Sequence, residues 1–515
     1  MSMNTQGRPT GIGSGAGYGS SSGSSLLPNE PLLFEVGDRD QSGVDLPEVE
    51  IDESFLGGFA RHTPLDLPGL TEPEAMRHYV RLSRLNYSID SGMYPLGSCT
   101  MKHNPRLNEK LARLPGFADI HPLQPVSTVQ GALQLMDQLA HWLMTLTNTA
   151  AVCLTPKAGA HGEMAGMMAI RAAQQAAGQG HRKVVLVPES AHGTNPATAA
   201  FLGYSVRSIP ARDDGTVDVE AVKAALGPDV AAIMLTNPNT CGLFEPQIIE
   251  IAAAIHAAGA FFYCDGANFN AIMGVVRPGD LGIDAMHINL HKTFSTPHGG
   301  GGPGAGPVVL SQALAPFAPV PFVRKGEALD LVEHAQAGHL GRVTAFHGQM
   351  GMYVRALTYM LSHGGNGLAQ AARDAVLNAN YVKARLEQAF SVPFPDQPVM
   401  HEALFDDSFL EGTGVSTLDF AKAMIDAGFH PMTMYFPLVV HGAMLIEPTE
   451  SESRQTLDHF CDVMLDLARD AKAGNTTRFS AAPSRAPRRR LDETRAARAP
   501  RLKWEPPQDL PQAAE

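Results

Sequence analysis

The chain of 515 residues is long enough for two domains with sizeable cores, and its 44% hydrophobic residues, 50 Gly and 38 Pro are typical of a loop-rich α/β protein. This composition excludes a fibrous or wholly disordered protein. The formal net charge of −13 argues against general nucleic-acid binding, and no apolar stretch is long enough to predict a membrane span.

The cysteines and the first residues indicate a cytoplasmic protein. The 5 cysteines are scattered without the spacing of a metal site, which favours reduced thiols. The sequence does not start with a basic segment followed by an apolar one, so we predict no secretory signal. Residues 1–30 are rich in Gly and Ser and contain few large apolar groups, which predicts disorder.

Residues 31–95 are predicted to form an N-terminal arm and one helix. The helix is expected to begin at Thr71, because Thr71 and Glu74 have the spacing of a capping box. The following stretch, residues 88–105, is dense in Gly, Pro, Ser and Thr but also contains apolar residues that exposed loops lack, among them Met93. We interpret it as a buried, functional loop.

Residues 96–335 are predicted to form a large α/β domain. Helices are expected at 130–146 and 163–175 and around Ala221 and Ile251. Strands are expected at 150–154, 183–187, 204–209, 230–235, 261–264 and 285–290. Strands that alternate with helices of this length predict a mainly parallel sheet covered by helices on both faces.

The rest of the chain is predicted to form a smaller α+β domain and a tail. Residues 336–475 contain a long helical pattern with a break at 364–367, then short strands and helices at about 417–427 and 451–470. Residues 476–515 are basic and Pro-rich. We interpret this tail as solvated or as facing a partner, and not as a nucleic-acid site.

Four groups are predicted to meet at the carboxyl end of the parallel sheet, which is where such sheets bind ligands. Lys292 follows the strand at 285–290, and Asp265 ends the strand before it. His192 follows the strand at 183–187, and the small residues Ala158, Gly159 and Ala160 precede a helix. The N-terminus of that helix offers N–H groups and a positive dipole end to a phosphate.

Each group taken alone also has an ordinary explanation. Lys292 would be a solvated surface lysine, His192 a cap, and Asp265 the N-cap of the next element. The glycines at 299–302 are not a nucleotide-binding P-loop, because no Gly-Lys-Ser or Gly-Lys-Thr ends them. A metal site lacks the tight His and Glu spacing that it would need.

Together the four groups suit one cofactor, pyridoxal 5'-phosphate (PLP). The small-residue turn would hold the phosphate and His192 would stack on the ring. Asp265 would bind the protonated ring nitrogen, and Lys292 would form the Schiff base through its amine. The joint pattern is far more specific than any of its members.

At these residues the sequence resembles the PLP-dependent P-protein of the glycine cleavage system, and more narrowly subunit 2 of its two-subunit form. The resemblance extends from about residue 32 to 507. It is carried by the segments 92–102 (GMYPLGSCTMK), 190–196 (SAHGTNP), 236–240 (TNPNT), 265–268 (DGAN), 291–302 (HKTFSTPHGGGG) and 444–452 (MLIEPTESE).

The resemblance implies the fold of a type I PLP-dependent transferase with a seven-stranded sheet. It implies that Lys292 carries the cofactor, with Asp265 at the ring nitrogen and His192 against the ring. The further residues expected to bind the cofactor are Ala158, Gly159, Ala160, Thr194, Asn268 and His291. No metal is implied.

The resemblance also implies an activity and partners. The expected enzyme is a glycine dehydrogenase, an oxidoreductase that releases CO2 from glycine and transfers the aminomethyl group to the lipoyl arm of the H-protein. Subunit 1 is expected to complete an α2β2 assembly in the cytoplasm. Two alternatives remain: another type I PLP enzyme, and a non-catalytic scaffold subunit of the same complex.

Overall fold

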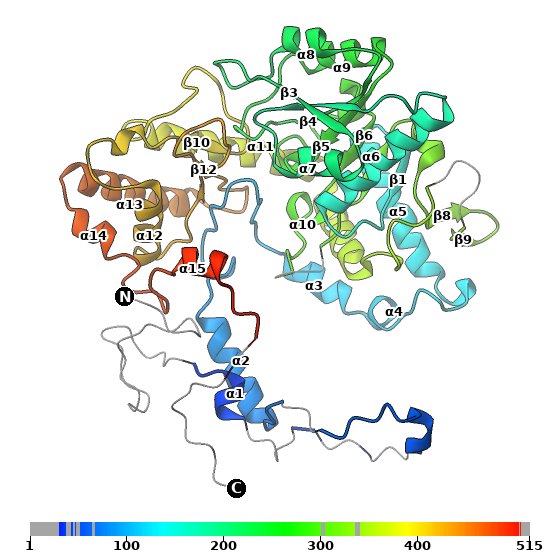
Figure 1. Ribbon diagram of the computed structural model, residues 1–515, viewed down its shortest axis with the longest axis horizontal. Coiled ribbons are helices and arrows are strands. Elements are labelled where there is room, and N and C mark those ends of the chain that lie inside the picture. The colour runs from blue at the N-terminus through cyan, green and yellow to red at the C-terminus, as the bar shows by residue number, and fades with distance from the viewer. Residues whose placement is uncertain are drawn as a thin grey trace. The chain divides into compact units, whose positions relative to one another are not determined.

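The structure, a computed structural model, describes residues 30–37, 43–44, 47, 52–63, 67–299, 304–334, 340–503 and 505. The chain divides into two compact units: Met1–Ser91 with Ala481–Glu515, and Gly92–Ser480. Figure 1 shows their elements. The predicted disorder of residues 1–30 lies outside the described residues except for Glu30, and so do the glycines at 300–302.

The first unit is built around α2 (Glu72–Arg84), with α1 (Leu33–Val36) and α15 (Glu493–Arg498). The predicted capping box is confirmed, because the Thr71 N–H donates to Glu74 Oε2 over 2.9 Å. The buried Glu30 carboxylate lies 2.8 Å from His78 Nδ1 and accepts from Arg81 Nη2 over 2.8 Å. These partners outweigh burial and lower the pKa of Glu30.

The second unit contains a seven-stranded sheet with the order β1-β7-β6-β5-β4-β2-β3. The strands are β1 (Ala151–Cys153), β2 (Val184–Pro188), β3 (Ser205–Ile209), β4 (Val230–Thr236), β5 (Phe261–Asp265), β6 (Ala285–His287) and β7 (Val308–Leu310). All pairs from β3 to β6 are parallel, whereas β7 is antiparallel to β6 and to β1. The predicted mainly parallel sheet is therefore confirmed.

The structure differs from the prediction in one additional strand and in one strand boundary. β7 was not predicted, because it offers only three apolar residues after a Gly- and Pro-rich loop. β6 ends at His287 and not at residue 290, since Leu290–Thr293 forms the short helix α10. Lys292 therefore lies on a helical turn beyond the strand and not at the strand's end.

Helices cover both faces of this sheet (Figure 1). One face packs against α5 (Gln130–Thr147), α8 (Val219–Ala225), α9 (Ile248–Ala257) and the first part of α11. The other packs against α6 (Gly159–Ala176) and α7 (Thr194–Phe201). β4 contributes to both cores, with Val230, Ile233 and Leu235 on one side and Ala231, Ala232 and Met234 on the other, and all seven of its residues are buried. This explains its continuous apolar sequence.

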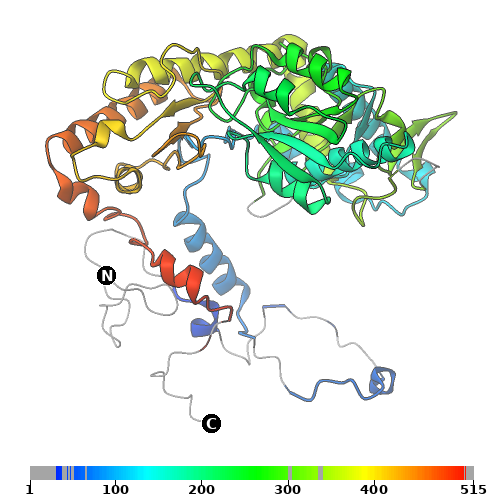
Figure 2. The ribbon, with the colours of Figure 1, turned by 45° about the horizontal axis from the view of Figure 1, so that its top comes forward.

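The helix α11 (Met350–Leu386) connects the large sheet to the small domain, as Figure 2 shows in yellow. It is interrupted at Gly364, where φ is 62°, so the predicted break is confirmed. The small domain has a three-stranded antiparallel sheet in the order β10-β12-β11. Its elements are β10 (Ala403–Phe405), β11 (Thr433–Met434), β12 (Met444–Ile446), α12 (Thr417–Asp426), α13 (Arg454–Lys472) and α14 (Thr476–Ser480).

The remaining elements flank the large sheet. They are α3 (Arg106–Ala112), α4 (Pro115–Ala118) and the hairpin of β8 (Phe322–Lys325) with β9 (Leu329–Val332). Across the described ranges, every helix is either too short or too polar to pass through a lipid bilayer.

A glycine directly after β5 allows the two central strand ends to approach each other. A Cβ on Gly266 would lie 1.8 Å from the His287 carbonyl oxygen, a backbone atom that cannot move away alone. We predict that Gly266→Ala destabilises the fold by about 3 kcal/mol or more, as overpacking against backbone does. The midpoint of urea unfolding measures this loss. Gly193→Ala is the control, since a Cβ there meets nothing within 4 Å; equal midpoints for both variants would contradict the argument.

Candidate functional site

A pocket opens at the carboxyl ends of β4, β5 and β6. Its volume is about 580 Å³, including the part that is open to solvent. The strands contribute Thr236, Asp265 and His287 to its wall. The other lining residues are Ser98, Gly159, Ala160, Glu163, His192, Thr194, Thr240, Ala267, Asn268, Asn289 and Lys292. This is the edge of the sheet at which the sequence predicts a site.

Most of the predicted site residues lie together in this pocket. Those that line it are Gly159, Ala160, His192, Thr194, Asp265, Asn268 and Lys292. Ala158 and His291 are not among its lining residues. Ala158 is the N-cap of α6. The ring of His291 accepts from the Ala305 N–H over 3.5 Å, and its Nε2 lies 3.2 Å from Asn289 Nδ2.

The N-terminus of α6 forms one wall of the pocket. The helix begins at Gly159, so the predicted start at residue 163 is wrong, and the predicted turn is the first turn of the helix. Glycines obscure this start in the sequence, but packing requires them. A Cβ on Gly159 would lie 2.7 Å from Asn289 Nδ2, and one on Gly162 2.4 Å from the Gly306 carbonyl oxygen. Ala158 has no side chain to cap the helix, which leaves its first N–H groups to an anion.

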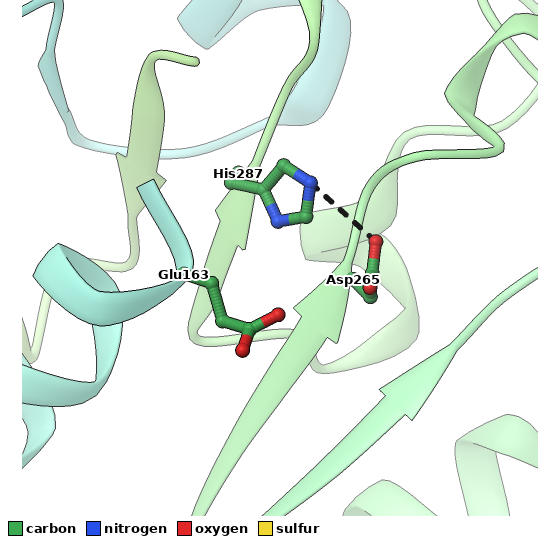
Figure 3. A group of neighbouring side chains, drawn as sticks. All are labelled: Glu163, Asp265 and His287. Atoms are coloured by element: carbon green, nitrogen blue, oxygen red, sulfur yellow. Dashed lines mark ion pairs between the residues drawn. The ribbon is translucent and has the colours of Figure 1, made fainter. Parts of the chain in front are cut away.

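Asp265 lies at the base of the pocket, at the end of a central strand. Its Oδ1 accepts from the Ala267 N–H over 2.9 Å, and its Oδ2 accepts from Asn195 Nδ2 over 3.1 Å. His287 Nε2 lies 3.4 Å from Oδ1, as Figure 3 shows. Burial raises the pKa of Asp265, but His287, these donors and the Lys292 charge together bring it below its ordinary value. The side chain is therefore a carboxylate that can accept a hydrogen bond from a protonated nitrogen.

Glu163 faces Asp265 from α6 (Figure 3). Asn195 Nδ2 donates to Glu163 Oε2 over 2.7 Å and so bridges the two carboxyl groups. Burial, and then the charge of Asp265, raises the pKa of Glu163 to about 7. Asp265 is therefore held charged, whereas the neighbouring Glu163 gains or loses its proton near neutral pH.

His287 completes this group as a neutral ring. Its Nδ1 lies 2.6 Å from the Tyr263 hydroxyl, and burial lowers its pKa. With the hydroxyl donating, the imidazole proton is on Nε2, which faces Asn289 and Asp265. Ligand atoms of Glu163, Asp265 and His287 lie within 4.8 Å of one another, close enough for a cation. Both carboxyl groups already accept hydrogen bonds from protein donors. This favours a site that accepts a hydrogen bond from an organic ligand over a cation site.

Lys292 lies on α10, half-buried, on the wall of the pocket. Its Nζ donates to the Ser98 carbonyl oxygen over 2.7 Å. This contact brings the loop of residues 93–101 onto the lysine. Met93 is 1% exposed and Cys99 is half-buried, so the loop is buried as predicted.

His192 lies at the mouth of the pocket. It is exposed, and its Nδ1 accepts from the Thr194 N–H over 3.2 Å. Phe436 meets the ring edge-on, with the centroids 5.6 Å apart. The histidine is thus fixed in orientation while its ring stays accessible from the pocket.

The residues present fit PLP. An amine, a carboxylate and the uncapped start of a helix suit the aldehyde, the ring nitrogen and the phosphate of that molecule. In the described part of the chain, Thr236 Oγ1 and Asn268 Oδ1 are buried without a hydrogen-bond partner, and both residues line the pocket. A polar ligand would satisfy them.

Several residues of the site were missed by sequence reasoning. Asn195 stands inside the quoted segment 190–196, and His287 alternates with Asn289 toward one face after β6. Their positions in the sequence could therefore have indicated that Asn195 and His287 belong to the site. Glu163 and Ser98 carried no such indication, because a glutamate on an Ala-rich helix and a serine in a loop are common everywhere.

Comparisons with known proteins identify the family. Residues 371–486 match the family model described as glycine dehydrogenase, C-terminal domain, and residues 160–332 match aminotransferase class-V. The probable glycine dehydrogenase (decarboxylating) subunit 2 of Caulobacter vibrioides is 68% identical over 496 residues, which is 95% of each chain. The chain belongs to this family. The protein of the same name from Listeria welshimeri is 49% identical over 480 residues, covering 92% of this chain and 98% of that protein.

Solved structures agree with the predicted fold class. A crystal structure of glycine decarboxylase (P-protein) of the glycine cleavage system, in inhibitor-bound form, superposes with a TM-score of 0.69 at 21% identity. It covers 81% of this chain and 94% of that one. The sphingosine-1-phosphate lyase of Burkholderia pseudomallei has a TM-score of 0.61 at 14% identity, covering 81% and 96%. At these identities the likeness concerns the fold alone, and it confirms the predicted fold. The relatives at 68% and 49% identity confirm the predicted family.

In this member of the glycine dehydrogenase subunit 2 family, Glu163 should make stability depend on pH. Its folded pKa of about 7 lies above its ordinary 4.5, so between these values the unfolded chain loses a proton that the folded chain keeps. Stability therefore falls as the pH rises through this window and stays lower above it. We predict that Glu163→Gln stabilises the PLP-free protein by about 3 kcal/mol above pH 7 and has little effect below pH 4.5.

Urea unfolding at several pH values measures this difference. The control is Glu250→Gln, because that side chain is 49% exposed and pairs with Lys223 at the surface. A Glu163→Gln variant whose gain in stability does not change with pH would contradict the assigned protonation.

Proposed function

We propose that this chain is the PLP-bearing subunit of a glycine dehydrogenase that decarboxylates glycine. The observation that carries the proposal is one pocket, in a member of this family, that joins Lys292, the ionised Asp265 and the start of α6. Two relatives named probable glycine dehydrogenase (decarboxylating) subunit 2 are 68% and 49% identical to this chain over almost its whole length.

The proposed cofactor contacts follow the geometry of the pocket. Lys292 would hold PLP covalently, Asp265 would bind its ring nitrogen and His192 would stack on the ring. The remaining proposed contacts are Gly159, Ala160 and Thr194 for the phosphate and Asn268 for a ring substituent, with Ala158 at the N-cap position of α6 and His291 beside Asn289. When bound, PLP withdraws electrons from the bond that releases CO2.

The side chains of the protein supply orientation and proton control. Asp265 keeps a negative charge beside the ring nitrogen, which stabilises a proton there. Lys292 is the amine that can accept or return a proton at the reacting carbon. The loop with Met93 and Ser98 covers the lysine and limits the entry of water.

The overall reaction proposed is glycine plus a lipoyl disulfide giving CO2 and an S-aminomethyl dihydrolipoyl group. The bond between the glycine α-carbon and its carboxylate breaks, and a carbon–sulfur bond forms. The sulfur–sulfur bond breaks, and the second sulfur takes up a proton as a thiol. The lipoyl arm would belong to the H-protein, which is the proposed second substrate.

The name subunit 2 of the relatives implies a subunit 1 as partner. We propose an α2β2 assembly in the cytoplasm, without nucleic acid or membrane as a partner. The division into an arm at 31–95, a PLP-binding domain at 96–335, a small domain at 336–475 and a tail at 476–515 is also a proposal.

We predict that the chain, mixed with subunit 1, lipoylated H-protein and PLP, exchanges isotope-labelled CO2 into glycine. Label in the glycine carboxylate measures the reaction, because only a reversible decarboxylation moves it there. Omitting the H-protein is the control and should reduce the exchange strongly. Transamination or desulfuration without any exchange would favour another type I PLP enzyme.

We predict that Lys292→Ala abolishes the visible absorbance band that PLP develops when it is bound covalently to the wild-type protein, because among the described residues Lys292 is the one amine that lines the pocket. Absorbance after gel filtration measures this. Lys157→Ala is the matched control, since this exposed lysine near the start of α6 is not among the lining residues. A wild-type protein without a band would favour the scaffold alternative.

A further inference from the structure

Two buried glutamates of the small domain stand opposite each other beside the site. Ala403 of β10 pairs with Ile446 of β12, and this antiparallel register puts Glu402 across from Glu447. Both side chains are 0% exposed. Two carboxyl groups at adjacent buried positions need an explanation, because ionising both there would be very costly.

One oxygen of each glutamate accepts from the loop that covers Lys292. Glu402 Oε1 accepts from the Ser98 N–H, and Glu447 Oε2 accepts from the Thr100 N–H over 2.8 Å. Ser98 and Thr100 have φ values of 63° and 46°, which non-glycine residues adopt only at a cost. The two acceptors stabilise this conformation.

The same loop conformation determines what the lysine contacts. The Ser98 carbonyl oxygen, next to the N–H held by Glu402, accepts from Lys292 Nζ over 2.7 Å. A chain of direct contacts thus runs from the two glutamates through the loop to Lys292. The glutamates do not line the pocket themselves. Their hydrogen-bonded connection to Lys292 passes through the loop.

The other oxygen of each glutamate points to a common centre. Glu402 Oε2 and Glu447 Oε1 lie 4.0 Å and 3.7 Å from His401 Nε2. Within the described residues, all three atoms are buried without a hydrogen-bond partner. Burial and the charge of Lys292 lower the pKa of His401 to about 3, so its ring is neutral. The ring therefore takes up no second proton, and a proton that neutralises one of the two carboxyl groups resides on a carboxyl oxygen.

The surrounding charges favour Glu402 as the holder of that proton. Burial and the charge of Glu447 raise the pKa of Glu402 well above its ordinary value. Burial raises the pKa of Glu447 to about 7, but hydrogen bonding from the Thr100 N–H and the charge of Lys292 oppose the shift while Glu450 adds to it. Cys99 on the loop stays a thiol, because burial raises its pKa to about 11.

We propose that Glu402 and Glu447 are a positioning pair that shares one proton, carried by Glu402 and donated toward Glu447, and that this pair clamps the loop whose Ser98 carbonyl orients Lys292. One proton removes the repulsion between the carboxyl groups, and the remaining charge strengthens the hydrogen bond from Thr100. The importance of orienting Lys292 rests on the proposed function. The pair itself can be tested without PLP, so the two ideas fail independently.

The first experiment counts charges by capillary electrophoresis of the full chain at about pH 8, above the pKa of about 7 of Glu447. Glu402→Gln should leave the net charge unchanged, because it replaces a neutral acid with a neutral amide. Replacing both glutamates by Gln should make the protein one unit more positive, as should the surface control Glu250→Gln. If Glu402→Gln itself adds a positive unit, both glutamates are ionised and the proposal is wrong.

A bound cation is the other use that the same three side chains allow, since their ligand atoms lie within 4.8 Å of one another. Zn²⁺ or Mn²⁺ should leave the urea midpoint of the wild-type protein unchanged. A rise in that midpoint that is absent in His401→Ala would assign the centre to a metal and overturn the shared proton.

The second experiment measures the loop through Cys99, which is half-buried while the other described cysteines are buried. Glu447→Ala should raise the alkylation rate of Cys99 about tenfold or more by releasing Thr100. Glu402→Ala should do the same by releasing Ser98, and the conservative Glu402→Gln should restore a rate within about twofold of the wild type.

Glu452→Ala is the matched control, because burial alone raises the pKa of this nearby glutamate to about 7. Urea unfolding confirms that each variant folds, and Glu447→Met, which fills the space without an acceptor oxygen, replaces Glu447→Ala if the latter does not. Equal alkylation rates in the Glu447 variants and the wild type would show that the pair does not hold the loop. A protein that passes these tests but exchanges no CO2 would lose only the proposed function.

Discussion

The carboxylate of Asp265, buried at the end of a central strand, is the constraint on which the site depends. A charge at this position is stable only if donors surround it, and they come from three separate elements: Asn195 on α7, the Ala267 N–H after β5, and His287 on β6. The parallel sheet is what brings these chain segments to one edge. Gly266 allows the ends of β5 and β6 to come so close that no side chain fits between them.

A second buried charge ties the covering loop to the turn that carries Lys292. Lys102, which follows the loop, donates from Nζ to Glu450 Oε1 over 2.6 Å, to Asn270 Oδ1 over 2.9 Å and to the Thr293 carbonyl oxygen over 2.8 Å. Burial opposes its charge, but Glu450 reverses this and raises the pKa of Lys102. The ammonium group therefore connects the loop, α10 and the small domain at one point. Losing either partner would leave an uncompensated buried charge.

Sequence reasoning predicted the parts of the fold that depend on pattern. The strands β2 to β5, the helix α5 and the break in α11 follow from periodicity and from glycine, and the structure has them close to the predicted bounds. The start of α6 was placed four residues late, because packing requires glycine at 159 and 162, where helix propensity disfavours it. Register and strand order, which place β7 between β6 and β1, are tertiary properties without a local signal.

The predicted site residues that line the pocket share one property: each lies at, or within a few residues of, the end of a strand or the start of a helix. Asp265 and the Gly159 turn are recognisable because position and residue type agree there. Glu402 and Glu447 could not be found in this way. They come from antiparallel strands of the other domain and are about 300 and 350 residues away from the serine and threonine that they hold.

Neutral histidines next to charged carboxyl groups recur on both sides of Lys292. His287 lies beside Asp265, and His401 lies beside Glu447; burial lowers the pKa of both rings. An imidazolium at either place would neutralise the carboxylate beside it. The negative charge near Lys292 would then be lost. A neutral ring instead fills the space and keeps water out while leaving that charge in place. The balance of charge around Lys292 is therefore set by carboxyl groups, with the histidines as uncharged packing.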